Sequence, residues 1–141
     1  MKTERARARL SDNGRKAVLV LDDEPIVLAV VTSALRTAGF DVLQAKTAKD
    51  AGTVFHTDAA RLCLGLIDIE LEGMSGVQFV QSLPTLTPRI PILFMTGLGT
   101  IEVEGLAPED PVLYKPFTAR TLLAAVENAL FGDSRQPHAV E

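Results

Sequence analysis

Short apolar runs in this chain stop abruptly at charged residues, and this restricts its fold more than any other feature. The runs and the residues that follow them are Ala17–Leu21 with Asp22 and Asp23, Leu62–Ile67 with Asp68, and Val112–Tyr114 with Lys115. Continuous apolar runs of this kind are typical of strands buried on both faces of a parallel sheet. Packing gives a buried strand no reason to end in an acid, and crowded acids are costly unless a cation neutralises them. The pattern therefore predicts a binding site at the strand ends.

Segments with helical spacing of apolar residues separate these runs. The first begins at Pro25, which a first helical turn tolerates, and ends before Gly39, a residue type that commonly ends helices. The other expected helices are residues 47–55 with Thr47 and Asp50 as a capping box, residues 77–83, and a last helix that Thr118 caps and Gly132 ends. The other expected strands are an edge strand at Asp41–Ala45 and a strand at Ile90–Thr96.

The alternation of strands and helices predicts an α/β fold with a doubly wound, five-stranded parallel sheet and helices on both faces. Glycine and proline crowd residues 97–111, so we expect the fourth helix of the alternation to be irregular or shortened. Ligands bind such sheets at the C-terminal ends of the strands. The residues that this rule brings to one edge are Asp22, Asp23, Asp68, Thr96 and Lys115.

The composition fits one soluble domain. The chain has 141 residues, of which 47% are hydrophobic and 23% charged, as in ordinary globular proteins. No stretch approaches the roughly 20 apolar residues of a membrane span, and Ala17–Leu21 is too short for an export signal. Cys63 is the only cysteine, so we expect neither a disulfide nor a cysteine metal site, and a reduced, cytoplasmic setting follows.

The net charge of −4 hides a basic start and an acidic body. Residues 1–16 carry six basic side chains against two acidic ones, a charge of +4, which leaves −8 for the remaining chain. An acidic body argues against a nucleic-acid surface. The expected organisation is a flexible basic arm at residues 1–15, one folded domain at residues 16–131 and a flexible tail at residues 132–141.

Four segments resemble the receiver domain of two-component response regulators. They are LVLDDEP at residues 19–25, GLIDIELEGMSG at residues 65–76, ILFMTG at residues 92–97 and YKPF at residues 114–117. Four matches in the right order, each at a predicted strand end, are far more specific than any one of them. The resemblance implies a flavodoxin-like receiver fold, of the chemotaxis-regulator type, with the strand order 2-1-3-4-5.

The chemistry of the gathered residues agrees with that resemblance. A carboxylate can accept a phosphoryl group if fixed positive charge meets the charged oxygens of the group, which makes Asp68 the expected phosphoacceptor. Asp22, Asp23 and Asp68 offer the hard oxygen ligands that Mg²⁺ prefers. Lys115 supplies a point charge and Thr96 a hydroxyl donor for the phosphoryl group.

The resemblance adds expectations that the residues alone do not give. It implies that the backbone carbonyl of Glu70 is a further Mg²⁺ ligand and that the peptide bond between Lys115 and Pro116 is cis. It implies a histidine kinase or a histidine phosphotransfer protein as the donor. The signal would pass to an unknown downstream protein by docking or by onward phosphotransfer, because only about ten residues follow the last helix. In this family the fourth and fifth helices and the strand between them commonly form the docking face.

Several positions depart from the family pattern. Val112 stands where receivers with an aromatic switch often have tyrosine or phenylalanine, and the aromatic Tyr114 lies directly before the lysine instead. Glu72 replaces a frequent proline and adds charge beside the metal site. Glu70 and Leu98, two residues beyond Asp68 and Thr96, are predicted to tune the lifetime of the phosphorylated state.

Other interpretations stay open at this point. Taken singly, the acids before Pro25 could favour a helix N-terminus, Asp68 could cap a turn and Lys115 could be a solvated lysine. An aspartyl-nucleophile phosphohydrolase of the haloacid dehalogenase type is an enzymatic alternative, since Asp68-Ile69-Glu70 loosely matches its D-x-D motif. A degenerate receiver that is never phosphorylated is another. We expect a phosphoaccepting signalling domain and not an enzyme.

Overall fold

Five strands form one parallel sheet in the order β2-β1-β3-β4-β5. The computed structural model describes residues 16–84, 90–97 and 103–132 of the chain. The strands are β1 (Ala17–Leu21), β2 (Asp41–Ala45), β3 (Leu62–Asp68), β4 (Ile92–Thr96) and β5 (Val112–Tyr114). The predicted doubly wound sheet, its strand order and the edge position of β2 are thereby confirmed.

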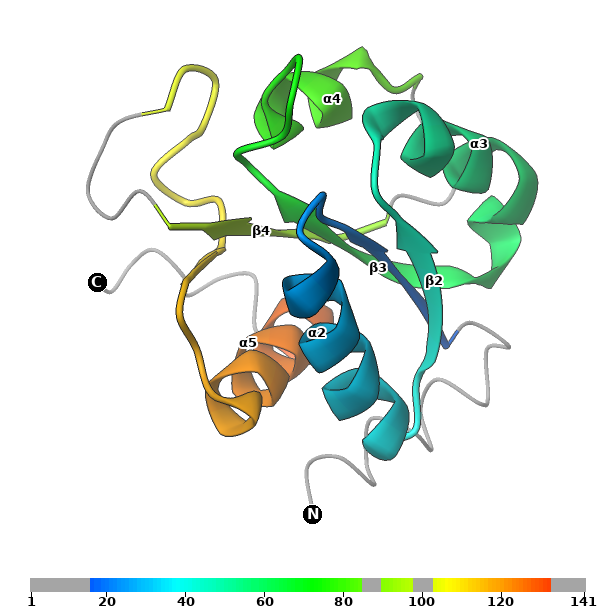
Figure 1. Cartoon of the computed structure of the whole chain (residues 1–141), viewed down its shortest axis with the longest axis vertical. Coiled ribbons are helices and arrows are strands. Elements are labelled where there is room, and N and C mark those ends of the chain that lie inside the picture. The colour runs from blue at the N-terminus through cyan, green and yellow to red at the C-terminus, as the bar shows by residue number, and fades with distance from the viewer. Residues whose placement is uncertain (1–15, 85–89, 98–102, 133–141) are drawn as a thin grey trace.

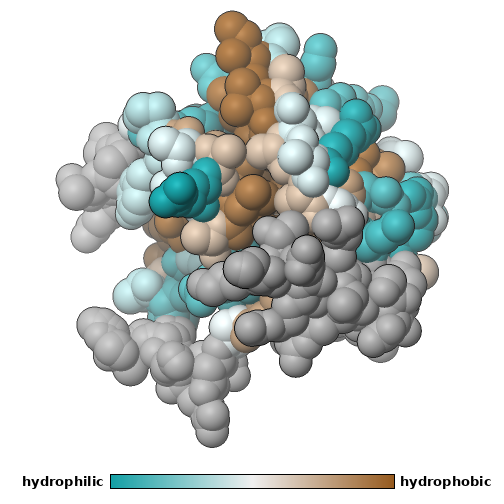
Figure 2. All heavy atoms as spheres, turned by 90° about the horizontal axis from the view of Figure 1, so that it is seen from below, coloured by the Kyte–Doolittle hydropathy of each residue, from teal (hydrophilic) through white to brown (hydrophobic). Residues whose placement is uncertain are grey.

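Helices cover both faces of this sheet (Figure 1). They are α2 (Pro25–Thr37), α3 (Ala48–Asp58), α4 (Gly76–Ser82) and α5 (Ala119–Phe131), with a short 3₁₀ turn, η1 (Ala59–Arg61), after α3. Helices α2 and α5 lie side by side on one face, and α3 and α4 lie on the other. Viewed from the side of α2 and α5, brown apolar patches lie among teal polar ones (Figure 2).

The two faces of β1 show why the sheet is buried on both sides. Val18 and Val20 belong to the apolar core under α2 and α5, whereas Leu19 and Leu21 belong to the core under α3 and α4. Successive side chains of a strand point to opposite faces, so a strand between two helical layers must be apolar throughout. Strand β3 follows the same rule, and all seven of its residues are buried.

Local sequence signals place the helix ends. Pro25 occupies the first turn of α2, and Gly39 follows this helix with a φ of 103°. The hydroxyls of Thr47 and Thr118 cap α3 and α5 by accepting hydrogen bonds from backbone N–H groups, as predicted. Helix α5 ends at Gly132, also as predicted.

Three boundaries differ from the sequence expectation. Helix α3 continues to Asp58 instead of ending at Phe55. Strand β4 begins at Ile92, because Pro91 has no N–H to donate and contributes its carbonyl, which accepts a 2.9 Å bond from Gly65 N. Helix α4 begins at Gly76, one residue before the predicted start, behind a capping box in which Ser75 and Gln78 hydrogen-bond each other's backbone N–H.

The segment between β4 and β5 lacks a regular helix in its described part. Residues 103–111 form turns, with Gly105 at a φ of 88°, which agrees with the expected irregular element. Residues 98–102 of that expectation, with Leu98 among them, lie outside the described residues. None of the helices in the described part of the chain is both long and apolar enough to cross a membrane.

Gly76 and Gly52 give a matched test of this packing. A Cβ at Gly76 would lie 2.1 Å from the Asp68 carbonyl oxygen, whereas a Cβ at Gly52 meets nothing within 4 Å. Gly76→Ala is expected to lower the free energy of unfolding by about 1–3 kcal/mol through overpacking. Gly52→Ala is expected to raise it by about 0.5–1 kcal/mol, because alanine restricts the unfolded chain. Urea unfolding measures both values, and equal effects would contradict the close approach at Gly76.

Candidate functional site

The predicted site residues meet at the C-terminal edge of the sheet, where the strand order reverses between β1 and β3. Leu21 of β1 is in register with Ile67 of β3, so the acids that follow these residues become neighbours. Asp68 pairs with Met95 of β4, which places Thr96 beside them. Such a reversal point is where doubly wound sheets bind ligands.

Three carboxylates converge at this point. One oxygen from each of Asp22, Asp23 and Asp68 lies within 4.8 Å of the other two. Asp22 and Asp68 are almost fully buried, with relative exposures of 0% and 1%, and Asp23 is exposed. Two buried acids beside a third repel one another, so the cluster needs positive charge.

Lys115 supplies part of that charge. Its Nζ lies 3.0 Å from Asp22 Oδ2, 3.3 Å from Glu24 Oε1 and 3.4 Å from Asp68 Oδ2. A single ammonium therefore faces three carboxylates, and the cluster keeps an excess of negative charge.

Backbone N–H groups fix the orientation of the acids. Asp22 Oδ1 accepts a 2.8 Å hydrogen bond from Glu24 N, and Asp68 Oδ1 accepts a 3.1 Å bond from Glu70 N. Asp23 Oδ2 accepts a 3.2 Å bond from Glu72 N, which ties the loop after β3 to the loop after β1. The acids are thus held in place before any ligand arrives.

The donor set fits a hard divalent cation. Among the described residues, Asp22 Oδ2 is buried and accepts no hydrogen bond, although Lys115 forms an ion pair with it. A buried oxygen in this condition is costly unless a cation completes its surroundings. Carboxylate oxygens converging from two loops match what Mg²⁺ takes from proteins, where it also keeps several waters.

The electrostatics of the cluster shift two pKa values. Burial, followed by the charge of Asp22, raises the pKa of Asp68 from 3.8 to about 7, against the opposing effect of Lys115. Burial acts to lower the pKa of Lys115, but the close contact with Asp22 and the charge of Asp68 outweigh it and raise this pKa to about 12. Lys115 therefore stays charged at neutral pH, while Asp68 titrates near neutrality.

The ends of β4 and β5 are joined through their backbones. Lys115 N donates a 2.8 Å hydrogen bond to the Thr96 carbonyl, and the following bond to Pro116 is cis, as the resemblance implied. Thr96 is buried and Tyr114 is 54% exposed, so the aromatic ring before the lysine lies outside the core.

Two site contacts were not foreseen from the sequence. The Glu24 carboxylate contacts Lys115, and the Glu70 carboxylate accepts hydrogen bonds from the Thr96 hydroxyl and from Gly97 N, the latter at 3.0 Å. Neither contact has a sequence signal, because both join segments far apart in the chain. The predicted role of the Glu70 backbone carbonyl as a ligand stays a prediction, as do the catalytic roles of Thr96 and Lys115.

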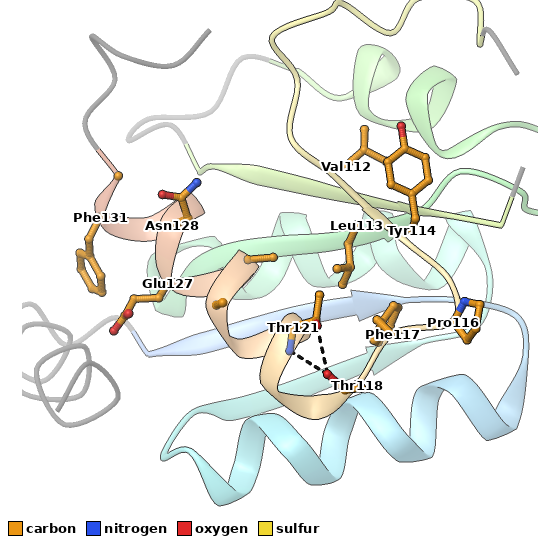
Figure 3. Close-up of a pocket in the computed structure, with 13 residues that line it drawn as sticks. Val112, Leu113, Tyr114, Pro116, Phe117, Thr118, Thr121, Glu127, Asn128 and Phe131 are labelled. Carbon is orange, nitrogen blue, oxygen red and sulfur yellow. Dashed lines mark hydrogen bonds between the residues drawn. The ribbon is translucent and has the colours of Figure 1, made fainter. Parts of the chain in front are cut away.

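A groove of about 850 Å³ lies next to this site, between β5 and α5 (Figure 3). Its lining includes Leu113, Pro116, Phe117 and Thr121 near the sheet edge and Phe131 at the far end of α5. None of the acids of the cluster lines it, so the groove is a separate surface. It shares a wall with the site, since Pro116 directly follows Lys115.

Comparisons with known proteins give the family. The family model described as "Response regulator receiver domain" matches residues 18–127. The chain is 32% identical over 131 residues to the phosphate regulon transcriptional regulatory protein PhoB of Pseudomonas aeruginosa. This match covers 86% of the chain and 56% of PhoB, so the chain spans about half the length of this relative.

Solved receiver structures are similar as well. A response regulator receiver domain protein from Clostridium thermocellum matches with a TM-score of 0.72 and 27% identity, covering 82% of this chain and 94% of that one. A response regulator receiver protein from Sinorhizobium medicae matches with a TM-score of 0.71 and 29% identity over the same shares of the two chains.

Removing the charge of Asp68 is expected to stabilise the ion-free protein at high pH. The folded state holds this proton up to about pH 7, whereas the unfolded chain releases it near 3.8, so the free energy of unfolding falls as the pH rises between these values. In chelator, Asp68→Asn should gain more at pH 8 than at pH 5, by roughly 2 kcal/mol. Urea unfolding at both values measures the difference.

The exposed Glu109 provides the control for that experiment. Glu109→Gln removes a carboxylate charge outside the cluster, so its effect on unfolding should be small and equal at the two pH values. A gain from Asp68→Asn that is the same at pH 5 and pH 8 would contradict the raised pKa.

Proposed function

The chain belongs to the response regulator receiver family of two-component signalling, and from this premise we propose that it is phosphorylated on Asp68. The observation that carries the proposal is the buried Asp68 carboxylate with Lys115 Nζ 3.4 Å away and two further acids converging on it. The donor would be a histidine kinase or a histidine phosphotransfer protein. Receivers in general are signalling domains and not turnover enzymes.

The proposed step transfers one phosphoryl group. An Asp68 carboxylate oxygen attacks phosphorus, and the bond between phosphorus and the donor's imidazole nitrogen breaks as the new P–O bond forms. The imidazole nitrogen keeps the electron pair of the broken bond. Lys115, already 3.4 Å from Asp68 Oδ2, faces the charge that develops on the phosphoryl oxygens. Thr96 offers its hydroxyl to another of these oxygens.

Asp22, Asp23 and Asp68 would hold Mg²⁺, together with the Glu70 carbonyl. When bound, the ion neutralises part of the negative charge of the acids and of the transferred group. Asp22 and Asp68 are buried and held by backbone N–H groups, so they keep their positions through the transfer. We expect the protein to work in the cytoplasm.

Exposed apolar side chains beside the acids suit contact with the donor protein. Ile26 and Val30 lie one turn apart on α2 and are 78% and 52% exposed. Helix α2 begins two residues after Asp23, so a partner that covers these side chains also reaches the cluster. Exposed apolar side chains next to a reaction site are typical of protein contacts.

The signal would leave through docking of a downstream protein or through onward phosphotransfer. The groove between β5 and α5 supports the docking route, because Pro116 and Phe117 join it to Lys115. Phosphorylation in this scheme biases an equilibrium between two conformations that already exist. The family match favours this scheme over the phosphohydrolase alternative.

Mass spectrometry of the intact protein tests the phosphorylation. With Mg²⁺ and acetyl phosphate, the wild type should gain one phosphoryl group, and Asp68→Asn should gain none. Lys115→Ala should label at least about tenfold more slowly, because it loses charge stabilisation of the transferring group. Chelation of Mg²⁺ should abolish labelling of the wild type.

Two results would redirect this interpretation. Continuous hydrolysis of a phosphate ester without stable labelling would favour the phosphohydrolase. An unlabelled wild type in Mg²⁺ would favour the degenerate receiver that acts only by binding.

Nuclear magnetic resonance tests whether the site and the groove are coupled. Beryllofluoride, a non-covalent mimic of the phosphoryl group, is added to the Mg²⁺-loaded protein. The amides of Leu113 and Phe117 should shift, because the chain between them carries Lys115. The amides of Lys49 and Thr53 on α3 serve as the control and should shift little. Equal shifts in both places would contradict a specific route to the groove.

A further inference from the structure

The Glu70 carboxylate accepts hydrogen bonds from two donors at the end of β4. Its Oε2 accepts a hydrogen bond from the Thr96 hydroxyl, and its Oε1 accepts a 3.0 Å bond from Gly97 N. Both oxygens of one carboxylate are thus engaged by two neighbouring donors. This pairing is a small anion-binding site that a side chain of the protein itself fills.

The same donors are needed by a phosphoryl group on Asp68. Thr96 has a single hydroxyl proton, so it cannot donate to Glu70 and to a phosphoryl oxygen at once. The Glu70 backbone N–H donates to Asp68 Oδ1, which fixes the start of the Glu70 side chain beside the phosphoacceptor. The carboxylate and an incoming phosphoryl group therefore compete for one place.

Charge strengthens this competition. The Lys115 ammonium contacts three carboxylates, those of Asp22, Glu24 and Asp68. Asp23 lies in the same acidic cluster, and Glu70 adds a further carboxylate at the end of β4. An incoming phosphoryl group adds further negative charge, and like charges at close range in a partly buried site repel strongly.

We infer that the Glu70 carboxylate is an internal stand-in for the phosphoryl group, which holds Thr96 and Gly97 until phosphorylation displaces it. The inference rests on the proposed function and deepens it. This role of Glu70 differs from tuning the lifetime of the phosphorylated state. It concerns the unphosphorylated state and the free energy needed to leave it. Glu70 is a positioning residue in this scheme, since it acts through Thr96.

Glu70→Ala and Glu70→Gln test the displacement directly. Both keep the backbone carbonyl that is proposed as a metal ligand. Loss of a hydrogen bond to a charged group corresponds to about tenfold or more in binding, so Glu70→Ala should bind beryllofluoride about tenfold more tightly than the wild type in saturating Mg²⁺. Glu70→Gln keeps one acceptor oxygen without the charge and should fall between the two. Calorimetric titration measures the three affinities.

Glu72 offers the matched control. It lies in the same loop and carries the same charge, but its backbone N–H donates to Asp23 and its side chain is exposed. Glu72→Ala should therefore leave beryllofluoride affinity within about twofold of the wild type.

The Gly97 amide gives a second readout that does not depend on phosphorylation. In the ion-free protein its proton should move upfield in Glu70→Ala, because it loses a charged acceptor, and should stay in place in Glu72→Ala. Equal beryllofluoride affinity in the wild type, Glu70→Ala and Glu70→Gln would overturn this inference and leave the proposed function intact. Wild-type protein that takes up neither beryllofluoride nor a phosphoryl group would overturn both.

Discussion

The ion pairs of Lys115 with buried acids are the interaction on which the site depends. The sheet brings Asp22 and Asp68 together at the reversal between β1 and β3, where their burial would be costly without compensating charge. One ammonium, 3.0 Å from the first and 3.4 Å from the second, meets part of that need. The negative charge that remains is the physical basis of the proposed cation site and of the proposed attack of Asp68 on phosphorus.

Sequence patterns were sufficient for those parts of the fold that local chemistry determines. Apolar runs gave the strands, and Pro25, Gly39 and Thr118 gave helix ends, because each residue type fits a specific backbone requirement. The strand-end rule then brought Asp68 and Lys115 together without any knowledge of distances. The family resemblance added the cis bond after Lys115, which spacing alone does not predict.

Contacts between side chains from distant loops could not be predicted in this way. The partners of the Glu24 and Glu70 carboxylates depend on how the loops after β1, β3 and β4 fold over one another. Helix boundaries such as the extension of α3 to Asp58 likewise depend on tertiary packing, which overrides propensity at helix ends. The irregular segment before β5 was predicted from composition, but the groove beside α5 was not, since a hollow is a property of packed surfaces.

The distribution of the site over the chain has a further consequence. Its side chains lie at the ends of four different strands, which are neighbours in one sheet. A fragment that lacks any of these four strands lacks part of the cluster, so the complete site requires the whole sheet. A ligand that binds only this arrangement stabilises every strand at once by mass action. Binding at this site and cooperative folding of the domain therefore depend on the same pairing of strands.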